Sequence, residues 1–181
     1  PFVDSMRTDP MGSLICVRKP RPASRRGAAK SPAKIMLAAH MDQIGFMVRH
    51  IEKNGFLRLN PVGGFDPRNL FARLVTVCAD SGDLPGILNP GGRPIHIATE
   101  EDQKRIPKVS DFFVDLGLPA DKVQRLVKIG DMVVLRAETI RVGEVVTGQC
   151  MDNRVACWIA IRALEKLRNH NCEIHCVFTD R

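Results

Sequence analysis

Residues 34–45, KIMLAAHMDQIG, run from an apolar stretch into His40 and, two residues later, Asp42. A continuous apolar run of this kind is typical of a strand that is buried on both faces, as in a parallel sheet. In open α/β sheets, ligands bind beyond the carboxyl ends of the strands, and His40 stands at such an end. A histidine there can ligate a metal ion while Asp42 orients its ring or supports a nearby base. His-x-Asp alone favours the simpler interpretation, a structural histidine followed by a turn aspartate.

Residues 147–154, TGQCMDNR, form the second candidate site, again between a predicted strand and a predicted helix. Asp152 can ligate a metal ion at such a strand exit. The simpler interpretation is that Asp152 and Asn153 only cap the helix that follows.

That helix is predicted over residues 154–168, because apolar residues recur there at helical spacing. Six residues fall at this spacing on the expected inward face, with a polar face opposite: Val155, Trp158, Ile159, Arg162, Leu164 and Leu167. Residues 172–179, CEIHCVFT, predict a further buried strand. A strand, a helix and a strand in succession indicate an α/β domain.

Between the two candidate sites, the sequence changes to short β-branched runs separated by turns. Residues 60–94 hold 11 of the 26 glycines and prolines of the chain, which predicts an all-β module, either a small barrel or a sandwich. The simplest arrangement is a β module inserted into an α/β domain. We therefore assign residues 1–43 and 133–181 to the α/β domain and residues 44–132 to the insertion.

The chain has 181 residues and a net charge of +7, and its excess charge lies in one segment. Residues 18–34 carry seven basic residues and no acidic one, among prolines, serines and a glycine, which predicts a mobile solvated loop. The alternative is a contact with nucleic acid or an acidic surface. A single tryptophan and no tyrosine argue against nucleic acid bound by stacked aromatics.

Other function classes are excluded by what the sequence lacks. No apolar run approaches the roughly 20 residues of a membrane span. There is no P-loop, no Rossmann glycine pattern and no G-x-S-x-G motif. The six cysteines form no CxxC pair and several lie in apolar runs, which predicts free thiols in a cytoplasmic protein.

Taken together, the two site motifs and their surroundings resemble the tetrahedral metallo-aminopeptidase family, which includes glutamyl and deblocking aminopeptidases and members labelled endoglucanase M. AAHMDQIGFMV at 38–48 and VTGQCMDNRVACWIAIRALEKL at 146–167 carry the resemblance at the two ends of the β-rich part. GRPIHIATEEDQKRIPKVSDFFVDLG at 92–117 resembles the middle of the family's inserted domain. These ordered matches are more specific than either metal motif alone.

The resemblance implies a zinc-peptidase-like mixed sheet flanked by helices and interrupted by a PDZ-like β-barrel dimerisation domain. Members of this family typically self-associate, from dimers up to twelve-subunit tetrahedra. Their activity is the release of N-terminal residues from peptide substrates by a water that is activated between two metal ions.

The resemblance also implies a dinuclear site of two divalent ions, zinc or cobalt, with manganese also compatible. His40 would ligate one ion, Asp152 would bridge both, and Asp42 would be a catalytic residue that supports His40. The family commonly has Glu where this chain has Gln43, and Asp where it has Asn153.

The remaining ligands and the glutamate base of the family follow the strand that here ends in VFT, close to the last residue, Arg181. We therefore expect an incomplete chain that is inactive alone. Two alternatives stay open: a non-catalytic oligomerisation module, and a binder of nucleic acid or acidic surfaces through residues 18–34.

Overall fold

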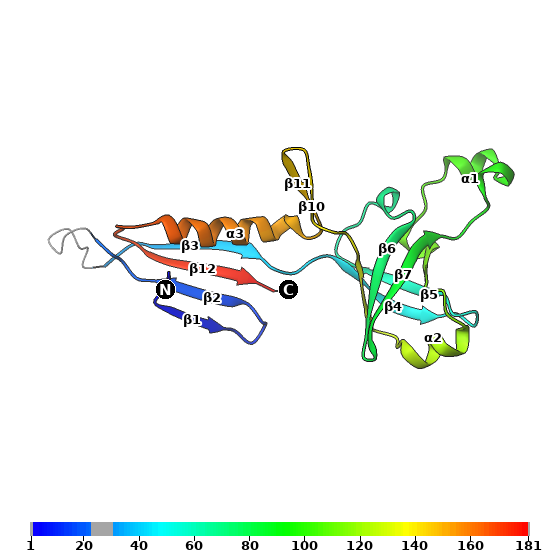
Figure 1. Ribbon diagram of the computed structural model, residues 1–181, viewed down its shortest axis with the longest axis horizontal. Helices are drawn as coiled ribbons and strands as arrows, with labels where there is room; N and C mark the ends of the chain where they lie inside the picture. Colours follow the sequence, from blue (N-terminus) through cyan, green and yellow to red (C-terminus); the bar gives the residue numbers. More distant parts are fainter. Residues whose placement is uncertain (1, 23–30, 181) are drawn as a thin grey trace. The chain divides into compact units, whose positions relative to one another are not determined.

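The computed structural model describes residues 2–22 and 31–180, and the chain divides into two compact units (Figure 1). The sheet unit comprises Pro1–Gln43 and Cys150–Arg181, and the barrel unit comprises Ile44–Gln149. The second boundary differs from the predicted end of the insertion at residue 132. The reason is that β9 (Met132–Leu135) hydrogen-bonds with two barrel strands and therefore belongs to the barrel.

The sheet unit is a mixed four-stranded sheet with one helix. Its elements are β1 (Ser5–Thr8), β2 (Leu14–Arg18), β3 (Lys34–His40), α3 (Met151–Lys166) and β12 (Glu173–Thr179). The strand order is β1-β2-β12-β3, with β12 antiparallel to β2 and parallel to β3. Because β3 and β12 are parallel, they end side by side, and Thr179 is the register partner of His40.

The strand of the His-x-Asp motif is less buried than its sequence predicts. Ile35 and Met36 are exposed, Met36 by 67%, and β3 is an edge of its sheet in the part of the chain that the structure describes. Within that part, α3 alone covers the sheet. The prediction of a strand buried on both faces was therefore wrong, and the helices expected on both sides of the sheet reduce here to α3.

The buried face of α3 also differs from the prediction. Trp158 is 61% exposed, and Val155 and Ile159 are exposed as well. Leu164, which belongs to the expected face, is buried, and so is Ala160; both pack against residues of the sheet such as Cys16, Ala39, Ile174, Cys176 and Phe178. Apolar residues surround much of this helix, so periodicity alone did not identify the face that packs on the sheet.

The described residues of the basic segment include charges that are buried or paired with carboxylates. Arg18 is buried at the end of β2, where its guanidinium donates to the carbonyl oxygens of Leu164 and Leu167. Arg21 pairs with Asp4 at 3.1 Å, and Lys34 pairs with Glu173 at 3.5 Å. Residues 23–30, the rest of the predicted mobile loop, lie outside the described residues. Arg18 therefore contributes to packing and not to a cationic surface.

The barrel unit is a closed antiparallel barrel in the order β4-β5-β8-β7-β6-β9, so the all-β module is a barrel and not a sandwich. Its other strands are β4 (Gly45–Ile51), β5 (Leu57–Val62), β6 (Arg73–Ala79), β7 (Gly82–Pro90) and β8 (Phe112–Asp115). Two helices, α1 (Glu100–Lys104) and α2 (Ala120–Leu126), and a hairpin of β10 (Ile140–Val142) and β11 (Val145–Thr147) complete the unit, with three short 3-10 turns at Pro67–Asn69, Ile95–Ile97 and Val109–Asp111.

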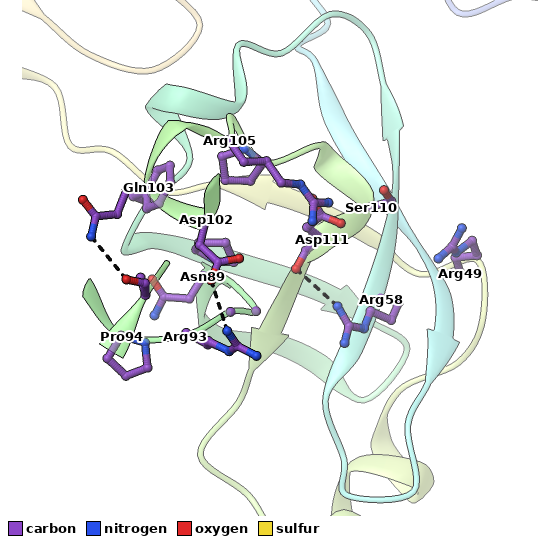
Figure 2. A pocket seen from close by; sticks show the side chains of 16 residues that line it. Arg49, Arg58, Asn89, Arg93, Pro94, Asp102, Gln103, Arg105, Ser110 and Asp111 are labelled. Carbon is purple, nitrogen blue, oxygen red and sulfur yellow. Dashed lines mark hydrogen bonds and ion pairs between the residues drawn. The ribbon is translucent and has the colours of Figure 1, made fainter. Parts of the chain in front are cut away.

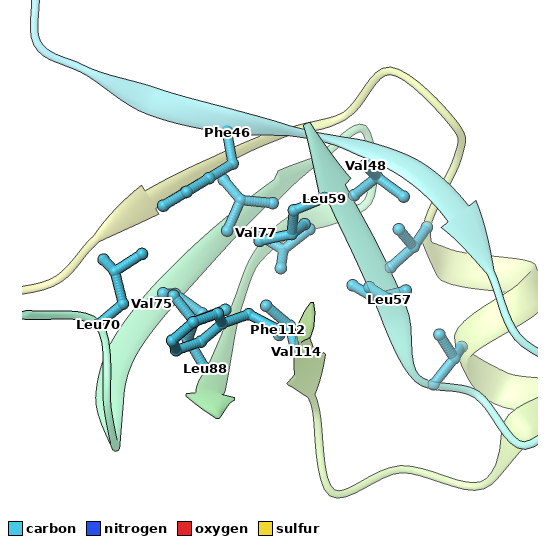
Figure 3. Packing of buried hydrophobic residues seen from close by; sticks show 13 residues of the cluster. Phe46, Val48, Leu57, Leu59, Leu70, Val75, Val77, Leu88, Phe112 and Val114 are labelled. Carbon is cyan, nitrogen blue, oxygen red and sulfur yellow. The ribbon is translucent and has the colours of Figure 1, made fainter. Parts of the chain in front are cut away.

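The barrel core consists of fully buried aliphatic and aromatic side chains, among them Phe46, Leu57 and Phe112 (Figure 3). They alternate with exposed residues along the strands, as expected when one face of each strand points inward. The turn between β4 and β5 contains Asn54 and Gly55, and Gly55 has φ +91°, a backbone angle that glycine adopts readily. No helix in the described residues has the length and apolarity to cross a membrane.

Candidate metal centre

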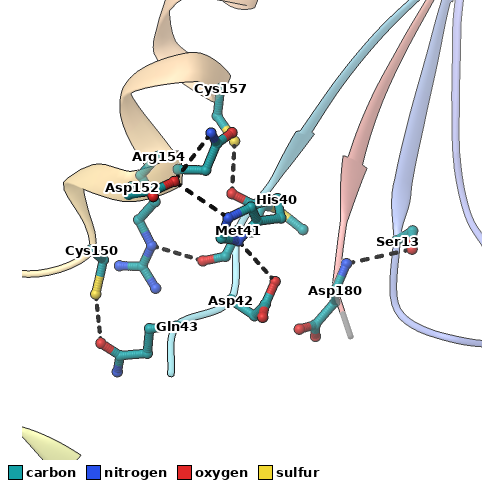
Figure 4. A network of polar contacts seen from close by, with 11 residues as sticks. Ser13, His40, Met41, Asp42, Gln43, Cys150, Asp152, Arg154, Cys157 and Asp180 are labelled. Carbon is teal, nitrogen blue, oxygen red and sulfur yellow. Dashed lines mark hydrogen bonds and ion pairs between the residues drawn. The ribbon is translucent and has the colours of Figure 1, made fainter. Parts of the chain in front are cut away.

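The imidazole of His40 lies between two carboxylates (Figure 4). Its Nδ1 is 3.2 Å from Oδ1 of Asp42, and its Nε2 is 3.6 Å from Oδ1 of Asp152. The structure thus brings together all three site residues predicted from the sequence, although Asp152 lies 112 positions beyond His40 in the chain.

The two carboxylates differ in exposure. Oδ1 of Asp42 is buried, and among the described residues it has no hydrogen bond of good geometry, so its contact with Nδ1 is an ion-pair distance only. The side chain of Asp152 is 93% exposed. A proton on Nδ1 facing Asp42 leaves the lone pair of Nε2 on the side of Asp152, which is the arrangement of a metal-binding histidine.

The backbone at the start of α3 keeps the Asp152 side chain outside the helix. Cys150 is the N-cap residue, with φ +62°, and it makes no side-chain capping bond. Asp152 and Asn153 have non-helical backbone angles, and regular helical geometry begins at Arg154. Asp152 therefore faces His40 and does not simply cap the helix.

Three side chains from the start of α3 hold the segment after β3. Nε of Arg154 donates to the carbonyl oxygen of Met41 at 2.8 Å, and Sγ of Cys150 donates to Oε1 of Gln43 at 2.5 Å. Sγ of Cys157 donates to the carbonyl oxygen of His40 at 3.4 Å, and burial raises the pKa of this thiol, which keeps it protonated. Sequence reasoning missed these contacts, because those of Arg154 and Cys157 go to main-chain carbonyls and that of Cys150 joins residues 107 positions apart.

The donor set fits a divalent cation in part. His40 and Asp152 offer an imidazole nitrogen and a carboxylate oxygen, both common zinc ligands. No group of three or more His, Cys, Asp or Glu side chains placed for a metal ion occurs in residues 2–22 and 31–180. A catalytic zinc usually has three protein ligands, and His40 and Asp152 offer two such donors.

A second histidine–carboxylate pair, His175 and Glu173, has a local role in β12. Nε2 of His175 lies 2.8 Å from Oε1 of Glu173 on the same strand, and this hydrogen bond lowers the pKa of Glu173. Ile174, Cys176 and Phe178 point to the opposite, buried face. The strand predicted over residues 172–179 is therefore confirmed, with every second side chain buried.

The mixed α/β fold with its closed antiparallel barrel is shared with solved aminopeptidases. An aminopeptidase from the archaeon Desulfurococcus kamchatkensis superposes with a TM-score of 0.83 and 31% sequence identity, over 99% of this chain and 47% of that chain. The TET1 peptidase of Pyrococcus horikoshii superposes with a TM-score of 0.77 and 26% identity, over 98% of this chain and 51% of that chain.

The chain belongs to the M42 glutamyl aminopeptidase family, whose sequence model matches residues 22–181. A lysyl aminopeptidase from Pyrococcus furiosus is 30% identical over 178 residues, which make up 96% of this chain and 48% of that protein. The chain thus spans about half the length of the curated relatives it matches. The family resemblance drawn from the two motifs is confirmed.

Proposed function

We propose that this chain forms part of a metal-dependent aminopeptidase that releases N-terminal residues from peptides. His40 and Asp152 are two of the ligands of a dinuclear site, and Asp42 is the catalytic residue that supports His40. The observation that carries the proposal is the position of the His40 ring, with Nδ1 toward one carboxylate and Nε2 toward another. Membership of the M42 family and the aminopeptidase names of relatives support it.

In this proposal, Asp42 and Asp152 have different roles at the site. Asp42 keeps the proton on Nδ1 and so directs the lone pair of Nε2 outward. Asp152, exposed and negatively charged, is free to bridge two cations and adds to the field that attracts a peptide's amino terminus. Bound divalent ions would acidify a water and polarise the peptide carbonyl. Zinc or cobalt suits this imidazole and carboxylate pair, and manganese is also compatible.

Metal binding by the purified 181-residue protein tests the site. Equilibrium dialysis against Zn²⁺ or Co²⁺ should give bound metal that His40→Ala and Asp152→Asn each remove. His50→Ala is the matched control, because His50 is exposed on β4 of the barrel unit. Metal binding that survives both site substitutions would refute the assignment of these ligands.

The barrel unit is the proposed PDZ-like dimerisation domain, and the sheet unit is the proposed zinc-peptidase-like part of the catalytic domain. The Pyrococcus horikoshii TET1 peptidase is described as assembling into a tetrahedron or a large octahedral shell, which supports self-association from dimer to dodecamer. The β10–β11 hairpin carries exposed Val142, Val145 and Val146, which a partner would cover. Light scattering should find oligomers that Val145→Glu weakens, whereas a monomer at all concentrations would contradict this role.

The second candidate function is a non-catalytic oligomerisation module. It is favoured by the presence of only two close metal donors among the described residues. An oligomer that binds no stoichiometric metal would support it over the aminopeptidase.

All six cysteines are free thiols, which supports a reducing, cytoplasmic location in either case.

A further inference from the structure

The barrel unit contains a pocket of about 970 Å³ rich in arginine (Figure 2). Its walls come from β4, β5, the end of β7 and the segment between β7 and β8. The charged residues that line it are Arg49, Arg58, Arg93, Asp102, Arg105 and Asp111. Four arginines and two aspartates thus line the same hollow.

The side chain of Arg58 is held by contacts within the barrel unit. Its Nε lies 2.5 Å from Oε1 of Glu52, and its Nη1 donates to the carbonyl oxygens of Asp111 and Phe112 at 3.3 and 3.4 Å. These bonds fix the pocket floor and neutralise this charge.

Arg93 and Arg105 can exchange their carboxylate partners for the anionic groups of a ligand. Each has a side chain that is 63% exposed, and each has one carboxylate partner, Asp102 at 3.5 Å and Asp111 at 2.9 Å respectively. Asp102 also accepts the backbone N–H of Thr99 in the capping box of α1. Exposed ion pairs of this kind contribute little stability, so an incoming anion can replace either carboxylate.

Arg49 carries the uncompensated charge of the pocket. The pairing of β4 with β5 shifts register between Val48 and His50, so that Arg49 is the extra residue of a β-bulge. Bulges re-aim side chains and recur next to binding sites. Within residues 2–22 and 31–180, no carboxylate lies at ion-pair distance from Arg49.

The pocket also has an apolar wall and is much larger than a single anion requires. Phe71 is exposed and packs edge-on against Phe112, with ring centroids 5.6 Å apart. Pro90, Pro94 and Pro107 line the same space. The volume is at the upper end of the range of ligand pockets, about 300–1,000 Å³.

We infer that this pocket binds an acidic peptide segment, whose carboxylates pair with Arg49, Arg93 and Arg105 and whose apolar side chain packs on Phe71. Arginine forks match carboxylates in a bidentate geometry, which favours this ligand class. The inference goes beyond the proposed function, because it involves neither His40 nor Asp152.

Fluorescence anisotropy with a dye-labelled peptide, acetyl-Glu-Glu-Phe-Glu-Glu-amide, tests the inference on the whole chain at about 0.15 M salt. The acetyl group blocks the amino terminus, so the peptide does not probe an aminopeptidase site. We expect saturable binding that Arg49→Gln and Arg105→Gln each weaken by about tenfold. Arg125→Gln is the matched control, since Arg125 pairs with Asp121 on α2 and lies outside the pocket lining.

Three results would overturn the inference. They are no binding at millimolar peptide, equal binding of the Gln-Gln-Phe-Gln-Gln analogue, and an equal loss in Arg125→Gln. Thermal melts of each variant show that its barrel remains folded, so that a loss of binding is assigned to the pocket.

Discussion

Arg18 is only 4% exposed, and its guanidinium donates a 2.7 Å hydrogen bond to the carbonyl oxygen of Leu167, immediately after α3. Leu164 also accepts from this guanidinium. The last carbonyls of a helix have no partners within the helix and carry partial negative charge, so a buried cation stabilises them. Arg18 thereby fastens the end of α3 to β2.

We expect Arg18→Met to lower the free energy of unfolding by about 2–3 kcal/mol, because the carbonyls lose charge-assisted hydrogen bonds. Chemical denaturation followed by Trp158 fluorescence measures this change. Arg21→Met is the control: Arg21 pairs with Asp4 at the surface, and its loss should cost under about 1 kcal/mol. An equal loss of unfolding free energy in the two variants would show that the hydrogen bonds of Arg18 stabilise the fold no more than a surface ion pair does.

Asp42→Asn should weaken metal binding at His40 by about 10- to 100-fold, because the amide no longer fixes the proton on Nδ1. Competition with a chromophoric chelator measures the affinity. Asp121→Asn on α2 is the control and should leave the affinity unchanged. An unchanged affinity in Asp42→Asn would contradict the supporting role of Asp42.

The pH dependence of stability should include a contribution from Asp4. A backbone hydrogen bond from Lys19, at 2.8 Å, and the Arg21 side chain hold the pKa of Asp4 below its ordinary value. A carboxyl whose folded-state pKa is depressed stabilises the fold above its unfolded pKa of about 4, and this stabilisation is lost as pH falls further. Urea denaturation should therefore show wild type more stable than Asp4→Asn at pH 6, with the difference vanishing toward pH 3. A difference that is constant over this range would refute the assignment.

The exposed side of α3 predicts an asymmetry between two substitutions. Trp158→Glu should change stability by less than about 0.5 kcal/mol, because Trp158 is a surface residue. Ala160→Glu should unfold the sheet unit, because it buries a charge against the sheet. Circular dichroism melts distinguish the two. Equal destabilisation by the two substitutions would mean that Trp158 packs on the sheet, as the periodicity predicted.

Local signals in the sequence predicted much of the fold. The helix predicted over residues 154–168 and the strand predicted over residues 172–179 depend on patterns among neighbouring residues, and both are present, as α3 and β12. The end of the insertion was not predicted, because the apolar run of β9 fits a strand of either unit, and only its pairing with β4 and β6 decides. The face of α3 was predicted at Leu164 but not at Trp158, because small residues such as Ala160 allow the helix to approach the sheet.

The structure brings the three predicted residues together, and it adds supporting contacts that the sequence did not predict. His40, Asp42 and Asp152 stand at recognisable strand exits. The bonds from Arg154 and Cys157 to main-chain carbonyls depend on how α3 lies across β3, which a single sequence does not specify.

The barrel is inserted between the two halves of the candidate site, and its entry and exit meet where Sγ of Cys150 contacts Gln43, 107 positions earlier in the chain. Joining the ends of an open segment of that length costs conformational entropy, by about 0.6 kcal/mol for each doubling of length. A barrel that closes on itself first leaves only a short tether between His40 and Asp152. The folded insertion therefore lowers the entropy cost of bringing His40 and Asp152 together. Weakening the barrel core should lower the affinity of the candidate metal site, to which the barrel contributes no ligand.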